Sequence, residues 1–427
     1  MEMNERMSKR LWPLAVVGLT LLGLLLACGS KYNASEDGLL VVGSQGTAVI
    51  ETFTFTLSNG HVSAVANTPN DTANLVCLMN GIPSSIVMDP KGQYAYAILN
   101  ENSTCPGSAT GIQAFQVRLD GSITTAGSLV TDTNPLALTM DPSGKFLFVV
   151  EGQKGLVNSY AIGSGGSLTL VPPTYNFVNG QGFQTPSIVA AAATFTTFPT
   201  IGINGVQNAV CSAPGETAPT TEYLYAVDSL NYVVWEFSVD TTTGALGSPV
   251  TGQAVPYFAT DQVPMGVAVD PCDRFVYVSD SLYGKVSAYT MCNGLATQNP
   301  NCIKPYTSSL VPVPNSPFSE TGNVNAPGPL IVDPYGKNLY VLNTLSNTVS
   351  EYKIAQTSGA ITALTPATVQ TGLMPTSIAI RADDNWLFVS NYNAASVFQY
   401  AVSPQTGTLS LQAPIPTDNY PWGVAVK

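Results

Sequence analysis

The sequence has few charged side chains, and histidine is almost missing from it. Charged residues make up 10% of the 427 residues, against roughly 25% in a typical soluble domain. The 15 basic and 27 acidic side chains give a net charge of -12, which excludes a basic groove for nucleic acid and a polybasic membrane patch. The only histidine is His61. A histidine-rich metal site is therefore excluded, and a Ser-His-Asp triad would depend on this single residue.

The amino terminus has the pattern of an export signal. Three basic residues among the first ten precede an apolar stretch over residues 11–27. The stretch ends in Leu-Leu-Ala-Cys-Gly at residues 25–29, which resembles the bacterial lipobox, where the cysteine is lipidated and becomes the new first residue. We therefore expect residues 1–27 to be a signal peptide, and residues 28–36 to be a linker that starts at lipidated Cys28. A plain transmembrane anchor is the alternative, since the stretch is at the short limit of the roughly 17 to 25 residues that span a bilayer.

The residue after the predicted lipidation site indicates a destination. Gly29 stands where an aspartate usually retains such lipoproteins in the inner membrane. This favours an exported protein that is anchored in the outer membrane or at the cell surface, with the lipid as its only membrane contact. Such a compartment is oxidising, so we expect disulfide bonds among the six further cysteines, Cys77, Cys105, Cys211, Cys272, Cys292 and Cys302.

One pattern recurs along the rest of the chain. It consists of a proline, an apolar strand, a turn of the type Asp-Pro-x-Gly-Lys, and an aromatic-rich strand that ends in Asn, Asp or Glu. Good copies occupy residues 83–100, 135–151, 264–280, 329–343 and 375–391, and a degenerate copy starts at Pro186 and resumes at residue 223 after a long insertion. Each copy continues into a third and a fourth strand. Four antiparallel strands per unit are the arrangement of a propeller blade, and a period of about 50 residues suits it.

The two ends of the chain supply a seventh unit. Residues 37–67 contain a second, third and fourth strand but no first strand, whereas residues 421–427 form a first strand with nothing after it. Pairing the two ends closes the ring and removes its exposed edges. We therefore predict an all-β fold in which residues 37–427 form a single domain. This domain is a seven-bladed β-propeller of four-stranded antiparallel blades, closed by the C-terminal strand that completes the N-terminal blade.

The strand, Asp-Pro turn and Tyr-Val-x-Asn pattern resembles the lactonase-type seven-bladed propeller family, often described by its Tyr-Val-Thr-Asn repeat. The resemblance covers residues 37–427. It is specific for the fold and weak for activity, because the family includes both 6-phosphogluconolactonase-like enzymes and many exported proteins with no assigned reaction. As in propellers generally, we expect the first-to-second and third-to-fourth strand turns on one face, which we call the Asp-Pro face. The second-to-third turns and the connections between blades lie on the other face, which we call the mouth face.

Two sets of carboxylates occupy fixed positions in the repeat. The aspartates that open the Asp-Pro turns are Asp89, Asp141, Asp270 and Asp333. We interpret them as turn residues that accept local backbone N–H bonds, not as catalytic groups. On the mouth face the second strands end in Glu151, Asp228, Asp280, Asn343 and Asn391, and Glu101 follows the corresponding Asn100.

The strand-ending residues on the mouth face allow two interpretations. A short polar side chain there can cap the tight turn into the third strand. Alternatively, Glu151, Asp228 and Asp280 form an acidic arc around the channel that binds a cation such as Ca²⁺ or polarises a hydroxyl-rich ligand. Three neighbouring charges are costly unless they are solvated or neutralised. Loop aromatics that could stack on a saccharide are Tyr232, Tyr283, Tyr392 and Trp422.

Few residues support an enzyme. The only arginines after the signal segment, Arg118, Arg274 and Arg381, lie on the Asp-Pro face, and Lys154 and Lys285 on the mouth face make a poor phosphate clamp compared with arginine. His61 lies at the outermost strand of the first blade, remote from the channel. The sequence therefore identifies no catalytic residue and, Ca²⁺ apart, no cofactor.

We predict a monomeric, lipid-anchored binding or scaffold module of the cell envelope. Its partner is an envelope protein or a saccharide, and not a nucleic acid. The alternative function is that of a lactonase-like hydrolase, related in fold to 6-phosphogluconolactonase, with a non-phosphorylated substrate.

The face assignment also narrows the disulfide pairing. Cys77 and Cys105 both fall on the mouth face, so they can pair. The other four cysteines fall on the Asp-Pro face, where Cys292 and Cys302 close a short loop within one connection. This leaves Cys211 to pair with Cys272 and tie blade four to blade five.

The predicted lipid anchor can be tested directly. We expect Cys28 to carry diacylglycerol, and we expect the substitution Cys28→Ser to release the protein from the membrane, because anchoring depends on the acyl chains. Mass spectrometry of the N-terminal peptide and membrane fractionation measure these outcomes. An unmodified peptide that spans residue 28 in the mature protein would contradict the prediction.

Overall fold

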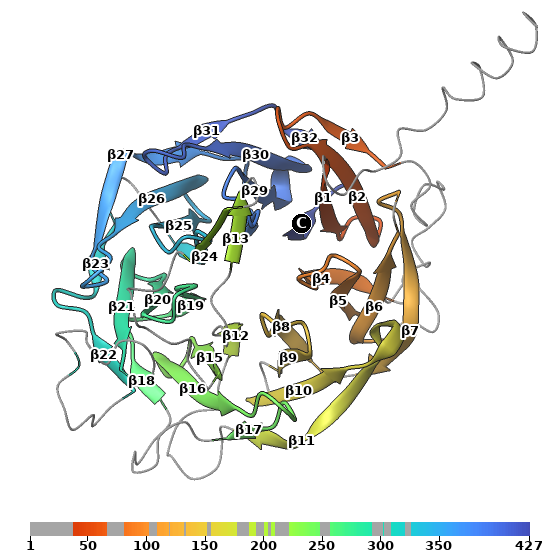
Figure 1. The fold of residues 1–427 in the computed structure, drawn as a ribbon, viewed down its shortest axis with the longest axis horizontal. Coiled ribbons are helices and arrows are strands. Elements are labelled where there is room, and N and C mark those ends of the chain that lie inside the picture. Colours follow the sequence, from red (N-terminus) through yellow and green to blue (C-terminus); the bar gives the residue numbers. More distant parts are fainter. Residues whose placement is uncertain are drawn as a thin grey trace, which may run out of the picture.

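The fold is a disc of β-sheets around a central channel. The computed structural model describes residues 37–65, 81–101, 109–118, 120–131, 134–151, 155–176, 188–193, 200–203, 206–209, 222–247, 257–292, 302, 309–320 and 326–427. Figure 1 shows the strands of these residues arranged as seven blades, with the innermost strand of each blade facing the axis. Among the described residues no helix is long and apolar enough to cross a membrane.

Each blade is an antiparallel sheet whose strands succeed one another from the axis outward. Blade 1 contains β33 (Pro421–Val426), β1 (Asp37–Ser44), β2 (Val49–Thr56) and β3 (Val62–Ala64); blade 2 contains β4 (Ile82–Met88), β5 (Tyr94–Asn100), β6 (Gly111–Val117) and β7 (Ile123–Thr131). Blade 3 contains β8 (Pro135–Met140), β9 (Phe146–Glu151), β10 (Leu156–Ile162) and β11 (Leu168–Asn176), with the short 3-10 turn η1 (Ser164–Gly166). Blade 6 contains β24 (Pro327–Val332), β25 (Asn338–Asn343), β26 (Thr348–Ile354) and β27 (Ile361–Gln370).

In the other three blades the outermost strand is divided into two short pieces. Blade 4 contains β12 (Ile188–Ala193), β15 (Glu222–Asp228), β16 (Val233–Val239), β17 (Leu246–Gly247) and β18 (Tyr257–Ala259). Blade 5 contains β19 (Pro264–Val269), β20 (Phe275–Asp280), β21 (Lys285–Met291), β22 (Leu310–Pro312) and β23 (Phe318–Ser319). Blade 7 contains β28 (Pro375–Ile380), β29 (Trp386–Asn391), β30 (Ser396–Val402), β31 (Leu409–Leu411) and β32 (Ile415–Pro416), with the 3-10 turn η3 (Tyr392–Ala394).

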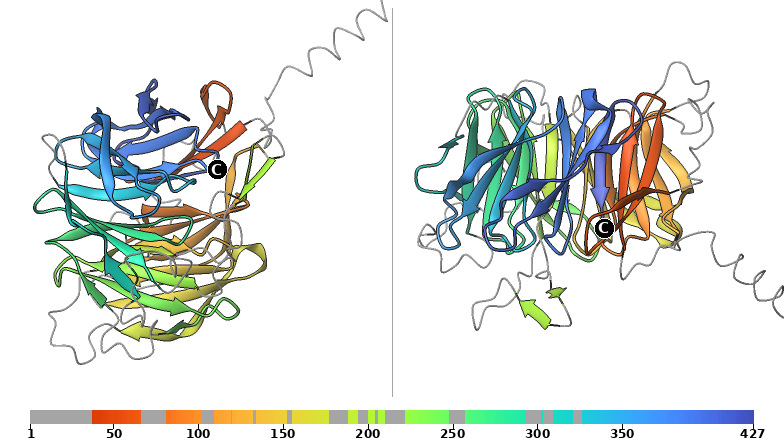
Figure 2. Two further views of the ribbon diagram at one scale, coloured as in Figure 1. Left: turned by 60° about the vertical axis from the view of Figure 1, so that its left-hand side comes forward. Right: turned by 90° about the horizontal axis from the view of Figure 1, so that it is seen from above.

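The insertion in blade 4 carries a small hairpin of its own. Strands β13 (Thr200–Ile203) and β14 (Val206–Ala209) pair with each other and, among the described strands, with no other. Because they lie between β12 and β15, they belong to the Asp-Pro face. The right-hand view of Figure 2 shows this hairpin standing apart from the disc.

The predicted seven-bladed ring and its closure are confirmed. β33 pairs antiparallel with β1, with Leu40 opposite Val426 and Val42 opposite Val424. Beyond the strand, Lys427 N–H donates to the carbonyl oxygen of Leu39 at 2.9 Å. The sequence pattern is wrong in one detail: the innermost strand of blade 6 begins at Pro327, two residues before the proline from which the repeat was counted.

The Asp-Pro turns behave as the turn interpretation predicts. Asp89 Oδ1 accepts the N–H groups of Gln93 and Tyr94 at 2.5 and 2.7 Å. Asp141 and Asp333 accept local N–H groups in the same way. The glycine of the Asp-Pro-x-Gly pattern supplies the left-handed conformation of the turn, as at Gly92 with φ of 63°.

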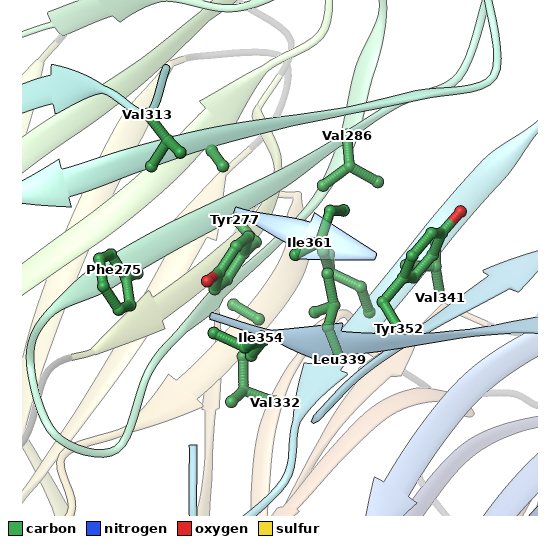
Figure 3. Packing of buried hydrophobic residues seen from close by; sticks show 13 residues of the cluster. Phe275, Tyr277, Val286, Val313, Val332, Leu339, Val341, Tyr352, Ile354 and Ile361 are labelled. Carbon is green, nitrogen blue, oxygen red and sulfur yellow. The ribbon is translucent and has the colours of Figure 1, made fainter. Parts of the chain in front are cut away.

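The hydrophobic core is divided among the interfaces between blades. The described residues contain seven main apolar clusters, and each combines side chains of two neighbouring blades. Figure 3 shows the cluster between blades 5 and 6, where Phe275 and Tyr277 of β20 meet Leu339 and Val341 of β25. The aromatic residues of the second strands thus pack between blades, as their spacing predicts.

Hydrogen bonds and close backbone contacts lock each interface. Tyr277 Oη donates to the carbonyl oxygen of Gly359 in the next blade at 3.0 Å, and Tyr340 Oη donates to that of Gly407 at 2.6 Å. A Cβ atom at Gly359 would lie only 2.4 Å from the Phe275 ring. Glycine is therefore required there by both its φ of 77° and the close approach of the neighbouring blade.

The described cysteines fit the predicted pairing as far as they test it. Cys292 and Cys302 form a disulfide bond with a Cα–Cα distance of 5.5 Å, which confirms this pair. Cys272 is also disulfide-bonded. Its predicted partner Cys211 lies outside the described residues, as does the predicted pair of Cys77 and Cys105.

Several carboxyl groups are buried within and between the blades. Glu351 of β26 is fully buried, and its Oε2 accepts the N–H of Leu409 from blade 7 at 2.8 Å. Burial raises the pKa of Glu351 to about 7 and the pKa of Glu222 to about 8. Partial burial likewise raises the pKa values of Glu320 and Asp384 to about 8.

These buried carboxyls predict how stability depends on pH. In the unfolded chain such groups release their protons near pH 4 to 4.5, whereas in the folded protein they keep them up to about pH 7 to 8. Between these values the folded state binds more protons, so the free energy of unfolding falls as pH rises. We expect a melting temperature at about pH 8 that is lower than at about pH 5. The substitution Glu351→Gln should flatten this dependence, and exposed Glu101→Gln should not. Equal slopes for both variants would contradict the prediction.

Candidate functional site at the mouth of the channel

A β-bulge recurs near the mouth end of every innermost strand. In β8, Pro135 pairs with Glu151 and Ala137 pairs with Val150, so Leu136 has no partner residue on the neighbouring strand. The same register shift leaves one residue of each other innermost strand without a partner residue on the neighbouring strand. These residues are Met265 in β19, Thr376 in β28, Trp422 in β33, Val189 in β12, one of Ser84 and Ser85 in β4, and one of Gly328 and Pro329 in β24. Bulges re-aim a side chain and are frequent next to functional sites. The bulge residues, one from each blade, occupy equivalent positions and together form a ring. The chemistry of their side chains differs from blade to blade.

The residue just before the innermost strand is strained in four blades. Val263, Ala326, Met374 and Tyr420 have φ between 56° and 60°, and each precedes a proline. Positive φ is uncommon for such residues, and for β-branched Val263 it is a clear outlier. Each of the four carbonyl oxygens accepts an N–H group from a second-to-third strand turn, as in the 2.9 Å bond from Ser281 to Val263. Strain held by the surrounding structure concentrates at functional sites.

The channel behind this ring is uncharged where the structure describes it. A cavity of about 500 Å³ is lined by β4, β8, β19, β24, β28 and β33. The described lining residues are aliphatic residues, methionines, serines, threonines, glycines, a proline and Trp422. None of them carries an ionisable side chain, so these residues supply no general acid or base for hydrolysis.

Large apolar side chains are exposed around the mouth. Ten of them, which we call the apolar crown, are Leu136, Leu230, Tyr232, Met265, Leu282, Tyr283, Leu345, Leu373, Met374 and Tyr420. They lie in the second-to-third strand turns, just before the innermost strands, or at their bulges. Leu345, the most exposed, is 72% accessible. The other exposed large apolar residues among those described, Leu170 and Leu411, lie on outermost strands. Exposed apolar residues therefore gather on one face.

An aromatic cluster stands within the crown. The ring of Tyr392 lies 4.9 Å from that of Tyr420 and 5.3 Å from that of Trp422, measured between centroids. The contact with Trp422 is edge-on at 89°, a favourable arrangement of ring quadrupoles. All four predicted loop aromatics thus lie on the mouth face, and two of them, Tyr392 and Trp422, contact each other. The prediction is wrong in one respect, because Trp422 lies within strand β33 and not in a loop.

The predicted strand-ending residues lie where the repeat places them, and they are buried. Asp280 Oδ2 accepts the hydroxyl of Ser287 at 2.6 Å, and Asn343 Nδ2 donates to Ser350 at 2.8 Å. Glu151 Oε1 accepts the amide of Asn158 at 2.8 Å. In all three pairs the partner comes seven residues later, on the third strand. The strand-ending side chain therefore holds the second strand to the third below the turn.

The remaining members have other local partners. Asp228 accepts the N–H groups of Leu230 and Asn231 within its own turn, and Asn391 accepts the hydroxyl of Thr371 at 2.9 Å. Glu101 is exposed. Among the described residues no three His, Cys, Asp or Glu side chains come together in a way that could hold a metal ion.

The described charged side chains near the mouth include a buried carboxyl and an ion pair. Burial raises the pKa of Asp280 to about 7. Lys285 Nζ lies 2.6 Å from Asp261 Oδ2, so this lysine is engaged by a carboxylate on its own face. Lys154 lies outside the described residues. Sequence reasoning concentrated on these polar groups and missed the bulge ring and the crown. The sequence does contain a signal for the crown, because a leucine or tyrosine stands where a turn normally carries polar residues, as at Leu282 and Leu345.

Comparison with known proteins agrees with this architecture. The family model described as "Lactonase, 7-bladed beta-propeller" matches residues 40–185 and 307–425, together more than half of the chain. No curated protein sequence matches the chain.

Solved structures show the same fold at low sequence identity. The crystal structure of a putative 6-phosphogluconolactonase from Bacteroides fragilis is 17% identical, with 92% of this chain and 99% of that one covered and a TM-score of 0.66. The periplasmic gluconolactonase of Pseudomonas aeruginosa is 15% identical, with 91% and 99% covered and a TM-score of 0.66. A protein from Lactobacillus plantarum is 14% identical, with 92% and 99% covered and a TM-score of 0.62. With more than half of its length matched by the family model, the chain belongs to the lactonase family of seven-bladed β-propellers.

Proposed function

We propose that this protein is an exported, lipid-anchored binding module of the cell envelope, and that it docks a partner protein on its mouth face. The observation that carries the proposal is the apolar crown. Monomeric proteins rarely expose many large apolar side chains on one face, and such patches mark interaction sites. Ten of them surround the channel opening, while the described outer strands expose two.

The composition of the crown favours a protein over a saccharide. Seven of its ten members are leucine or methionine, which bury well against another apolar surface but stack poorly on sugar rings. Methionine and aromatic residues are enriched in protein interfaces, where lysine and glutamate are depleted. The cluster of Tyr392, Tyr420 and Trp422 supplies a rigid aromatic anchor of the kind that dominates binding energy.

The direction in which the chain enters the disc supports this orientation. β1 runs from Asp37 on the Asp-Pro face to Ser44 at the mouth, where the next residue, Gln45, donates its N–H to Tyr420. Nine linker residues from Cys28 to 36 reach about 30 Å when extended. A lipid on Cys28 would thus hold the Asp-Pro face toward the membrane and leave the crown free. The export that this arrangement needs is supported by the signal-like amino terminus, and a periplasmic enzyme is among the structural neighbours.

The crown can be tested by cross-linking in cells of the source organism. A photo-reactive p-benzoylphenylalanine at Leu345 should give a discrete adduct with an envelope protein, because this side chain lies in the proposed interface. The same group at Leu411, an exposed leucine on an outermost strand, should give none. The substitution Leu282→Glu should reduce the Leu345 adduct about tenfold, because it places a charge in an apolar contact. Equal adducts from both positions would contradict the proposal.

A second candidate function is hydrolysis of an uncharged lactone, which the family match favours. The described channel lining offers no acid or base for it. We therefore expect the purified protein to leave the spontaneous hydrolysis of gluconolactone unchanged, with or without added Ca²⁺ and with or without a chelator. A pH-stat assay measures this rate. Turnover above the spontaneous rate would favour the hydrolase over the binding module.

A further inference from the structure

A second cavity lies at the rim of the disc, where blade 7 meets blade 1. It has a volume of about 720 Å³, and we call it the rim groove. One wall is the hairpin of β2 and β3, with Phe53, His61 and Val62. The other wall is Gln399 of β30 with the segment 412–416, which follows β31 and includes β32. Figure 1 shows β3, β31 and β32 together on the outside of the ring, away from the channel. The rim groove is thus separate from the crown and independent of the proposed docking surface.

A buried amide in this groove has an unused donor. Gln399 is 2% exposed, and its Nε2 has no hydrogen-bond partner among the described residues. A buried donor without a partner costs about 1 to 3 kcal/mol. A Cβ atom at Gly60 would lie 2.7 Å from this nitrogen. Gly60, which also lines the cavity and has φ of 69°, therefore packs closely against this nitrogen, and residue 60 places no side chain between the amide and the cavity.

The titratable group of the groove is the histidine of the chain. His61 is exposed at the edge of the cavity, and its backbone N–H donates to Asn59 Oδ1 at 2.9 Å. No other described lining residue from β2, β3, β30 or the segment 412–416 is titratable. In a chain with 27 acidic residues, the described lining of this groove contains no carboxylate.

The geometry points to the rim groove as a binding site for a small carboxylate ligand with an apolar body. A carboxylate has two acceptor oxygens, so it can accept from Gln399 Nε2 and from the His61 imidazole at once. Its apolar body would pack against Phe53, Pro414 and Ile415. Charge-assisted hydrogen bonds are about twice as strong as neutral ones, so the site prefers a carboxylate to an alcohol.

Nuclear magnetic resonance can test this site, because His61 is the one histidine of the sequence and its Hε1 proton gives one resolved imidazole signal. The probes are sodium benzoate and the neutral analogue benzyl alcohol, titrated into the intact mature protein. We expect benzoate to shift the His61 signal saturably. Benzyl alcohol should bind about tenfold more weakly.

Two glutamine variants give a matched comparison. Gln399→Met keeps the side-chain volume and removes the donor, so the Kd for benzoate should rise about three- to tenfold. Gln412→Met is the control, because its Nε2 already donates to the carbonyl oxygen of Ser410 at 3.0 Å, and it should leave the Kd unchanged. If Gln399→Met does not fold, the comparison of benzoate with benzyl alcohol in the unaltered protein decides. Any of three results would overturn the proposal. They are the absence of a saturable shift of the His61 signal, an equal response to both probes, and equal effects of the two variants.

Discussion

The pairing of β33 with β1 is the contact on which the rest of the structure depends. It joins residues from the two ends of the described fold into one sheet, with Val42 opposite Val424. Since each apolar cluster is shared by two neighbouring blades, no blade buries its core alone. Without this pairing, β1 would lose its inner neighbour and the interfaces on both sides of blade 1 would open. The rim groove also lies beside this closure, between blade 7 and blade 1.

A repeated backbone with varied side chains explains how the mouth face can carry function. The bulge and the strained residue before the proline are features of the backbone, and they recur because each blade bends its innermost strand in the same way. The side chains at these points differ, from Trp422 to Met265 and Thr376. The fold therefore sets where a contact residue stands, and the local sequence sets its chemistry. At the exposed positions of the crown that chemistry is apolar or aromatic.

Burial, more than ion pairing, governs the charged groups of this protein. Glu351 and Asp280 each accept a hydrogen bond on one oxygen, and the other oxygen is buried without a partner among the described residues. Such groups are more easily buried in the neutral form. Glu151, Asp280 and Asn343 thus serve the fold as hydrogen-bonded groups that hold the second strand to the third. This structural role accounts for their recurrence in the sequence at the same position of successive blades.

The sequence by itself determined the number of blades, the order of their strands, the role of the Asp-Pro turns and the pairing of Cys292 with Cys302. These features follow from local spacing, such as the proline, aspartate and aromatic positions of each repeat, and from counting which strands the two ends lack. Tertiary structure alone decided the rest. The bulge at Leu136 is a shift of register between two strands, and the crown collects Leu282, Leu345 and Tyr420 from separate blades. The Nε2 donor of Gln399, which has no hydrogen-bond partner among the described residues, depends on how Gly60 of the neighbouring blade packs against it. Each of these depends on how distant segments meet, which no local pattern in the chain records.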